Sequence, residues 1–194
     1  MRRFKILVAL SFSAFLAGCV ASTSRVDVAT DEPFSDTETS SKDLLTVAQQ
    51  MSSSLIQLPQ IQNAKNPPRI AFADVKNETN EIINKNMFIE KMRTNLLKHA
   101  AGRMVFLDRE LSEQIANERA NKRSGDVTHA GLRTKLGADF FLTGKLSSID
   151  KQSGGRRSTY TRYAFRLTDA ESTAVVWEDD YEVKKIGKAA TWDR

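Results

Sequence analysis

The sequence predicts a single α/β (α+β) domain over residues 42–194, with helices packed on a mixed β-sheet. Two patterns support this fold class. In the first half of the domain, apolar stripes at helical spacing alternate with short apolar runs, and in the second half three strand-like segments follow one another across short turns. The composition, 40% hydrophobic and 27% charged in 194 residues, is that of an ordinary globular chain.

The domain is expected to begin with a helix from residue 42 to about residue 57, capped by Ser41, because its apolar residues form one stripe. The stripe consists of Leu44, Ala48, Met51 and Leu55. After a proline-containing break, residues 69–75 form a first strand. This strand is apolar on both faces, which is typical of a central position in a sheet. The polar residues 76–85 form the loop that follows it.

Helical and extended patterns continue to alternate through the middle of the chain. The next three elements are a helix from Asn84 or Asn86 to about Ala101, a short strand at 104–107, and a charged surface helix at 108–123. Gly102 ends the first of these helices. A further helix is expected from Thr128 through Leu136, closed by Gly137.

The last part of the domain reads as three strands, at 139–149, 157–168 and 175–184. Gly154 and Gly155 form the turn between the first two of them. The early strands, which helices separate, should pair in parallel, and the last three should form an antiparallel meander. Four apolar residues should share one face of the final strand: Val175, Trp177, Tyr181 and Val183. The tail from residue 186 onward is expected to be frayed.

The first 18 residues have the form of a secretory signal peptide, because the basic MRRFK precedes 13 apolar or small residues, too few to span a bilayer. The segment ends in Leu16-Ala17-Gly18-Cys19, which resembles the lipobox of bacterial lipoproteins. That resemblance implies that Cys19 is lipidated, with acyl chains such as palmitate, and that it becomes the first residue. The next residue is Val20 rather than Asp, which favours the outer membrane and its periplasmic face over the inner membrane.

Residues 19–41 are interpreted as a flexible linker, because serine, threonine and acidic residues predominate and no helical or strand period is present. The linker carries a net charge of −4, whereas residues 42–194 carry +6. A basic domain on an acidic tether could meet an acidic partner, or it could simply have a soluble surface. Nucleic acid is an implausible partner in the periplasm.

The sequence offers no catalytic constellation, and no cofactor or metal site is expected. There is no G-x-S-x-G motif, and lipidation consumes the single cysteine. His99 and His129 lack the spacing of zinc ligands. Gly154 and Gly155 precede two arginines, but they join two strands rather than a strand and a helix, so a hairpin turn is favoured over a phosphate loop.

The alternation of the last three strands predicts one polar face of the sheet. Its candidate docking residues are Thr143, Lys145, Arg162, Arg166 and Glu178. Two interpretations remain open. Cross-strand pairing of these bases with the acidic residues of the last strand could merely keep the face solvated. Alternatively, the face docks a protein partner, for which arginine and tyrosine are favoured anchors.

The loop after the first strand also has two interpretations. The side chains of Asn77, Thr79 and Asn80 can satisfy backbone groups of the loop and of the helix that follows it. Alternatively, they form a ligand site at the carboxyl end of a central strand, where open α/β sheets bind their ligands.

Three motifs resemble those of one known family. Val75-Lys-Asn77-Glu-Thr79-Asn80 is similar to the V-x-N-x-T-N stretch of the LpoB family, which comprises outer-membrane lipoprotein activators of penicillin-binding proteins. Leu136-Gly-Ala-Asp139-Phe-Phe-Leu142 is similar to the family's [VL]-G-A-x-[YF]-x-L entry to a strand. Val175-Val176-Trp177 is similar to its terminal I-I-W strand. The resemblance spans roughly residues 45–185 in the same order.

The resemblance implies a small domain related to the amino-terminal domain of TolB and to curli-secretion lipoproteins. It implies a non-enzymatic function, in which the protein binds and stimulates a class A, bifunctional penicillin-binding protein of the inner membrane. The linker departs from the family, because enteric members have a long proline-rich linker and this one is short and acidic. The alternative function is a structural lipoprotein of an envelope assembly or secretion complex, such as curli export.

Overall fold

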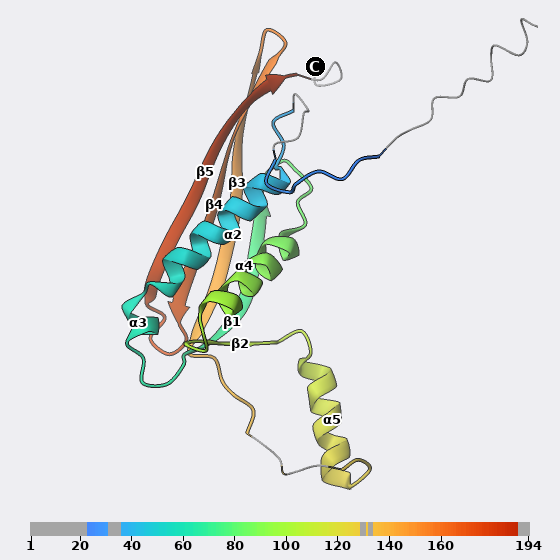
Figure 1. The fold of residues 1–194 in the computed structure, drawn as a ribbon, viewed down its shortest axis with the longest axis vertical. Coiled ribbons are helices and arrows are strands. Elements are labelled where there is room, and N and C mark those ends of the chain that lie inside the picture. Colours follow the sequence, from blue (N-terminus) through green and yellow to red (C-terminus); the bar gives the residue numbers. More distant parts are fainter. Residues whose placement is uncertain (1–22, 31–35, 129–130, 132–133, 190–194) are drawn as a thin grey trace, which may run out of the picture.

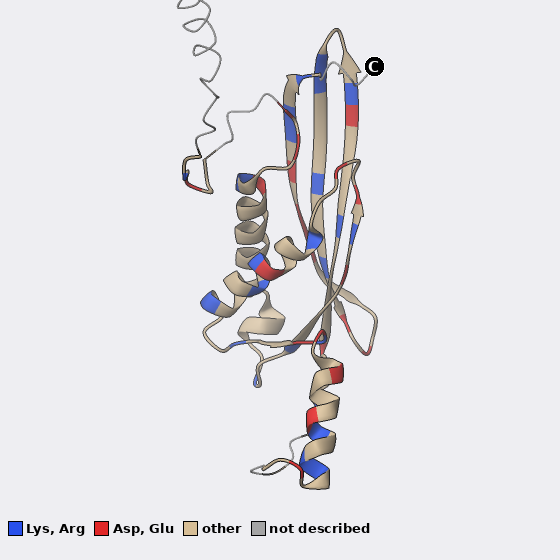
Figure 2. Ribbon diagram, turned by 90° about the vertical axis from the view of Figure 1, so that its right-hand side faces the viewer, with Lys and Arg blue, Asp and Glu red and all other residues tan. Residues whose placement is uncertain are grey.

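The computed structural model describes residues 23–30, 36–128, 131 and 134–189. In this part of the chain, a five-stranded sheet in the order β2-β1-β3-β4-β5 carries helices on one of its faces (Figures 1 and 2). The strands are β1 (Arg69–Glu78), β2 (Val105–Leu107), β3 (Phe140–Ser153), β4 (Arg156–Asp169) and β5 (Val175–Lys188). The helices are α2 (Ser41–Ile56), α3 (Pro59–Gln62), α4 (Lys85–His99) and α5 (Ser112–Ser124).

The sheet is mixed, as the sequence predicted. β1 pairs in parallel with β2 and with β3, whereas β3, β4 and β5 form an antiparallel meander. β1 therefore has a neighbour on each side. It runs three residues past its predicted end at Val75, because a register shift between Phe72 and Val75 lets its pairing with β3 resume. Gly154 and Gly155 both have positive φ and form the two-residue turn between β3 and β4.

Helices α2 and α4 cover one face of the sheet and contribute six of the seventeen residues of the buried core cluster. The cap of α2 is Ser40 rather than the predicted Ser41: its Oγ accepts from the Asp43 N–H at 3.2 Å, and an Asp43 carboxylate oxygen accepts from the Ser40 N–H at 2.8 Å. Asn84 caps α4, as one of the two predicted alternatives. The buried side chains of the two helices are mainly those of the predicted stripes, with Val47 of α2 buried as well.

The core lies between the two helices and the sheet, with Tyr163 of β4 near its centre. Tyr163 is fully buried, and its ring centroid lies 5.4 Å from that of Phe88 on α4 and 6.2 Å from that of Tyr181 on β5. On β5, Trp177 is buried and donates its indole N–H to Ser54 of α2 at 3.0 Å. Aromatic rings thus tie both helices to the meander.

Part of the predicted acidic linker packs on this body. The Thr37 and Thr159 hydroxyls are 2.7 Å apart, and the Thr39 hydroxyl lies 2.9 Å from the Tyr163 hydroxyl. Lys185 of β5 donates to the Glu38 carbonyl at 2.6 Å. Thr37 is buried. Residues 37–39 therefore bind along the inner side of β4 and β5, ahead of the first residue of α2.

The helix predicted from Thr128 to Gly137 is wrong for the described residues of that segment. Residues 128, 131 and 134–138 are not helical. Gly131 has a φ of +109°, which a right-handed helix does not allow. Leu136, which was expected to belong to an apolar stripe, is 49% exposed, so it has little surface to pack against. Spacing alone suggested a helix that tertiary contacts do not support.

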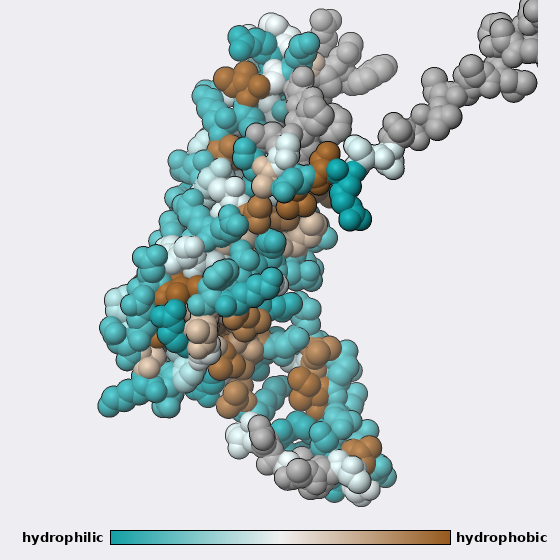
Figure 3. Space-filling view, viewed as in Figure 1, coloured by the Kyte–Doolittle hydropathy of each residue, from teal (hydrophilic) through white to brown (hydrophobic). Residues whose placement is uncertain are grey.

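Helix α5 confirms the predicted surface helix, and it stands away from the rest of the body (Figures 1 and 2). None of its residues is buried. Leu111 and Ile115 are exposed, and Figure 3 shows apolar surface over the upper part of this helix. Gly125, in the left-handed conformation, ends it.

The meander is longer than predicted. β5 continues to Lys188, so the prediction of a frayed tail is wrong for residues 186–188, and residues 190–194 lie outside the described part. The predicted apolar row on β5 holds for Trp177, Tyr181 and Val183, which pack on or within the core. It is wrong for Val175, which is exposed, because the register shifts where β5 begins to pair with Leu167 and Thr168.

A carboxylate joins the starts of the two central strands. Asp139 accepts from the Arg69 backbone N–H at 2.7 Å and from Arg69 Nε at 2.9 Å, and the two side chains form an ion pair. The hydrogen bonds from Arg69 hold the pKa of Asp139 below its ordinary value. A carboxyl with a depressed pKa stabilises the fold at neutral pH and loses that contribution as the pH falls through its folded pKa.

We therefore expect that in Asp139→Asn the free energy of unfolding depends less on pH below neutrality. The free energy of unfolding, measured in urea at pH 7 and pH 3, should fall less between the two values in the variant than in the wild type. Glu90→Gln, an exposed carboxyl on α4, is the matched control and should leave the wild-type slope unchanged. An identical pH slope in Asp139→Asn and the wild type would contradict the role of this carboxylate.

Candidate functional site

One face of the sheet has no helix packed on it in the described part of the chain (Figure 2). We call it the open face. Because side chains alternate along a strand, it consists of the odd-numbered residues of β3 and the even-numbered residues of β4 and β5. The structure places all five predicted docking residues on it: Thr143, Lys145, Arg162, Arg166 and Glu178.

Three of these residues form one row across the sheet. Thr143 is the register partner of Arg166, and Arg166 is the register partner of Glu178. Arg166 Nη2 lies 3.1 Å from Glu178 Oε1. The guanidinium is thus held in the middle of the row by a carboxylate from the neighbouring strand.

A second cluster lies further along the same two strands. Arg162 forms an ion pair with Asp180, and its Nε lies 3.9 Å from Glu182. Tyr160 donates its hydroxyl to Glu182 at 2.7 Å. The hydrogen bond to Asp180 raises the pKa of Arg162, and the hydrogen bond to Glu182 raises the pKa of Tyr160. The arginine therefore stays charged and the phenol stays neutral at any pH the protein meets.

The bases of the open face are paired but remain accessible. Lys145 Nζ lies 2.6 Å from a Glu78 carboxylate oxygen on β1. The side chains of Lys145, Arg162 and Arg166 are 40–54% exposed. Pairs at this exposure add little net stability. Cross-strand pairing does solvate the face, and it also holds three basic groups in fixed positions where a partner can reach them.

The open face also carries apolar side chains that the sequence analysis did not single out. Phe141 is 39% exposed and Ile149 is 58% exposed, both on β3. Ala164, the register partner of Lys145 and of Asp180, is almost fully buried on the same face. The alternation that placed Thr143 and Lys145 on this face would also have placed Phe141 and Ile149 there. Exposed apolar groups among arginine and tyrosine are typical of a protein-binding surface.

The side chains of Asn77, at the end of β1, and of Thr79, just after it, bond within residues 77–81. Asn77 donates to the Glu81 carbonyl at 2.9 Å and accepts from the Thr79 hydroxyl at 2.7 Å. Asn80 Nδ2 donates to Asp150 of β3 at 2.7 Å. The bond from Asn77 to the Glu81 carbonyl is of the kind that the first interpretation of the loop requires, whereas Asn80 binds a side chain of a distant strand. The ligand role of Asn77, Thr79 and Asn80 stays a prediction.

Asp150 links this loop to the long meander. Its carboxylate also accepts from the Thr159 hydroxyl at 2.6 Å and from Arg157 at 3.2 Å. Burial by itself would raise the pKa of Asp150, but the hydrogen bonds from Thr159, Asn80 and Arg157 together bring it below its ordinary value. The carboxylate therefore stays ionised and joins the loop to β3 and β4.

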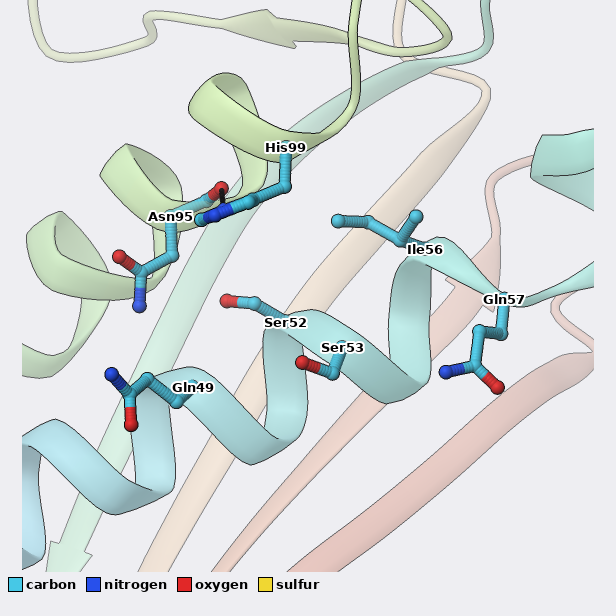
Figure 4. Close-up of a pocket in the computed structure, with 7 residues that line it drawn as sticks. All are labelled: Gln49, Ser52, Ser53, Ile56, Gln57, Asn95 and His99. Atoms are coloured by element: carbon cyan, nitrogen blue, oxygen red, sulfur yellow. Dashed lines mark hydrogen bonds between the residues drawn. The ribbon is translucent and has the colours of Figure 1, made fainter.

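A groove on the other side of the molecule runs between α2 and α4 (Figure 4). Gln49, Ser52 and Ser53 of α2 face Asn95 and His99 of α4 across it. His99 Nδ1 lies 2.8 Å from the Asn95 carbonyl, and Asn95 Nδ2 is buried without a hydrogen-bond partner. The groove brings together amides and hydroxyls and contains neither a carboxylate nor a thiol.

The described residues form no set of three His, Cys, Asp or Glu side chains that could hold a metal ion. Among the helices that the structure describes, none is long and apolar enough to cross a membrane. The predicted lipidation site, Cys19, and the second histidine, His129, lie outside the described residues.

Comparison with known proteins identifies one family. The family model described as peptidoglycan-synthase activator LpoB matches residues 43–183, which is most of the chain. A search of curated proteins gives no match. The family match covers the whole sheet except the end of β5, and it includes all five residues of the open face that the sequence analysis singled out.

Similar solved structures include the LpoB C-terminal domains of Escherichia coli and Salmonella enterica. They are 16% and 15% identical to this chain, with TM-scores of 0.46 and 0.44, and each match covers 73% of this chain and 98% of the other. The lipoprotein GNA1162 from Neisseria meningitidis is 16% identical, with a TM-score of 0.37 over 61% of this chain and 83% of its own.

Proposed function

Because this chain belongs to the LpoB family of peptidoglycan-synthase activators, whose members are not enzymes, we propose that it binds and stimulates a class A penicillin-binding protein through the open face of its sheet. The observation that carries the proposal is the uncovered face itself. It combines three accessible basic groups with exposed apolar side chains, on strands whose other side carries the hydrophobic core.

The proposed cellular position is the periplasmic face of the outer membrane. It rests on the sequence Leu16-Ala17-Gly18-Cys19 and on the absence of Asp at position 20. Several acyl chains on Cys19 would give a stable anchor at about 0.8 kcal/mol per buried CH₂. The anchor and the open face then serve different partners, one a lipid bilayer and the other a protein.

Stimulation requires that the protein bind the active state of the synthase more tightly than its inactive state. A rigid, preformed surface suits this role, because little ordering entropy is lost on binding. The ion pairs of Arg162 and Arg166 fix both guanidinium groups before a partner arrives. When the synthase docks, each arginine can then exchange the carboxylate of its own sheet for a carboxylate of the synthase.

Reversing both arginines tests the proposal. We expect Arg162→Glu/Arg166→Glu to weaken binding to the synthase at least tenfold, because two positive anchors become like-charged neighbours of Asp180 and Glu178. Binding is measured with each of the organism's purified class A penicillin-binding proteins, together with the rate of glycan polymerisation and cross-linking from lipid II. The stimulated rate should fall to that of the synthase alone.

Two comparisons keep the result interpretable. Ile149→Ser removes an exposed apolar side chain of the same face without touching an ion pair, and it should also weaken binding. Lys91→Glu/Lys98→Glu makes the same charge change on the helix layer and should bind as the wild type does. Wild-type affinity in both open-face variants, with thermal unfolding showing them folded, would refute docking through this face.

A further inference from the structure

Strand β5 forms a long free edge of the sheet. It is 14 residues long, and the strand order of the described residues places it last, with β4 as its neighbour on one side. Figure 1 shows it along one side of the molecule, with α2 in front of it. An edge of this length is a template for pairing with another strand unless it is protected.

The register shows which main-chain groups of β5 point away from β4. Ala189, just after the strand, donates its N–H to the Gly155 carbonyl at 3.0 Å, so the odd-numbered residues bond toward β4. Even-numbered residues then direct their N–H and C=O groups outward. Gln50 of α2 donates to the Asp180 carbonyl at 3.3 Å, as expected for an outward-facing group.

The charges along this edge are divided between its two halves. Glu178, Asp180 and Glu182 lie in the first half, and Lys184 and Lys188 lie in the second. All five are even-numbered, so their side chains lie on the open face. The two lysines are exposed, and among the described residues neither forms an ion pair. The three carboxylates also contact Arg162, Arg166 or Tyr160 of β4, and the lysines have no such partner on β4. The edge itself has an acidic half followed by a basic half, which is self-complementary when two copies run antiparallel.

We infer that β5 pairs antiparallel with β5 of a second copy of this chain, around a two-fold axis at Val183. In this register Glu182 lies opposite Lys184 of the second copy, and Glu178 lies opposite Lys188. Symmetry produces each pair twice. The outward-facing main-chain groups of the even-numbered residues meet one another, which allows roughly a dozen hydrogen bonds.

The neighbouring registers are disfavoured by charge. Moving the axis one residue toward the amino terminus puts Glu182 opposite Glu182 of the second copy and leaves Asp180 opposite Lys184 as the favourable pair. Moving it one residue the other way puts Lys184 opposite Lys184 and leaves Asp180 opposite Lys188. Each shifted register therefore has fewer favourable pairs than the register at Val183, and it adds a repulsive one. Like charges directly opposite one another are destabilising. The dimer at Val183 would join two five-stranded sheets into one and place their two open faces side by side.

Sedimentation velocity tests the inference. The sample is the chain from residue 20 onward, which keeps every described residue and leaves out the signal segment and the acyl site. We expect a concentration-dependent dimer that weakens as salt is raised. Lys184→Glu should weaken the dimer at least about tenfold, because it creates two like-charged pairs across the axis. Glu182→Lys should do the same.

Mixing the two variants gives the decisive result. In an equimolar mixture, the Glu182 of one chain meets the Lys184 of the other, and the two substituted residues also meet as an opposite pair, so dimers should return. Lys98→Glu on α4 is the control and should dimerise as the wild type does. A monomeric wild type, or a mixture that stays monomeric while both variants fold, would overturn the inference. Neither outcome depends on a synthase.

Discussion

Replacing Gly144 with valine should destabilise the protein strongly. A Cβ atom at this position would lie 2.7 Å from Cε1 and 2.9 Å from Cδ1 of Phe165, and 3.1 Å from Cγ2 of Val75. Both neighbours are almost completely buried, so neither side chain has space to move into. Overpacking of a core costs about 1–3 kcal/mol and sometimes more, and valine adds two further methyl groups to the clash. Small domains have only about 5–15 kcal/mol of stability in all.

The measurement is the midpoint of urea unfolding followed by circular dichroism. Gly144→Ala should lower the midpoint clearly, and Gly144→Val should lower it further or abolish the transition. Gly137→Ala is the matched control, because nothing lies within 4 Å of the added Cβ and its backbone is not left-handed. Combining Gly144→Ala with Phe165→Leu should recover part of the loss. A Gly144→Val variant that unfolds with the wild type would show that β3 and β4 do not approach this closely.

Removal of the Tyr163 ring should have the second large effect. The ring contacts Phe88 and Tyr181, and its hydroxyl bonds to Thr39. Burial raises the pKa of this phenol well above its ordinary value, so it stays neutral throughout the range in which the protein folds. Loss of a buried aromatic ring costs about 3–5 kcal/mol, and we expect Tyr163→Ala to fall in that range.

Tyr163→Phe separates the ring from the hydroxyl. It removes only the bond to Thr39, for which we expect a cost of about 1 kcal/mol. Both variants are compared by urea unfolding. Limited proteolysis then reports whether residues 37–39 have become accessible to cleavage, as expected in both variants. Equal losses of stability in the two variants would contradict the assignment of most of the effect to ring packing.

Local patterns predicted those parts of the fold in which one face of an element meets the core. The stripes of α2 and α4 and the alternation of β3 to β5 fall in this class, because burial of one face imposes a period on the sequence. The same alternation placed Arg162 and Arg166 on a common face with Thr143. Strand order, parallel pairing of β1 and the antiparallel meander followed from the lengths of the connections.

Features that depend on contacts between distant segments were missed. Thr37 and Thr39 resemble any linker residues, and only their hydrogen bonds to β4 distinguish them. The residues around Leu136 have helical spacing, but no surface covers them. The shift at the start of β5 exposes Val175, because one extra residue changes the face on which a side chain lies. Phe141 and Ile149 were missed for another reason, since apolar residues in a strand are first assigned to the core.

Helix α5 and residues 37–39 lie at opposite ends of the body. Residues 37–39 join the body near the start of α2, at the end of the sheet where the β3–β4 turn also lies, and α5 leaves from the opposite end (Figure 1). A strand of 14 residues such as β4 is about 45 Å long. If the proposed lipid anchor on Cys19 is present, the body would act as a spacer between the bilayer and α5. Leu111 and Ile115 would then be carried toward the interior of the envelope.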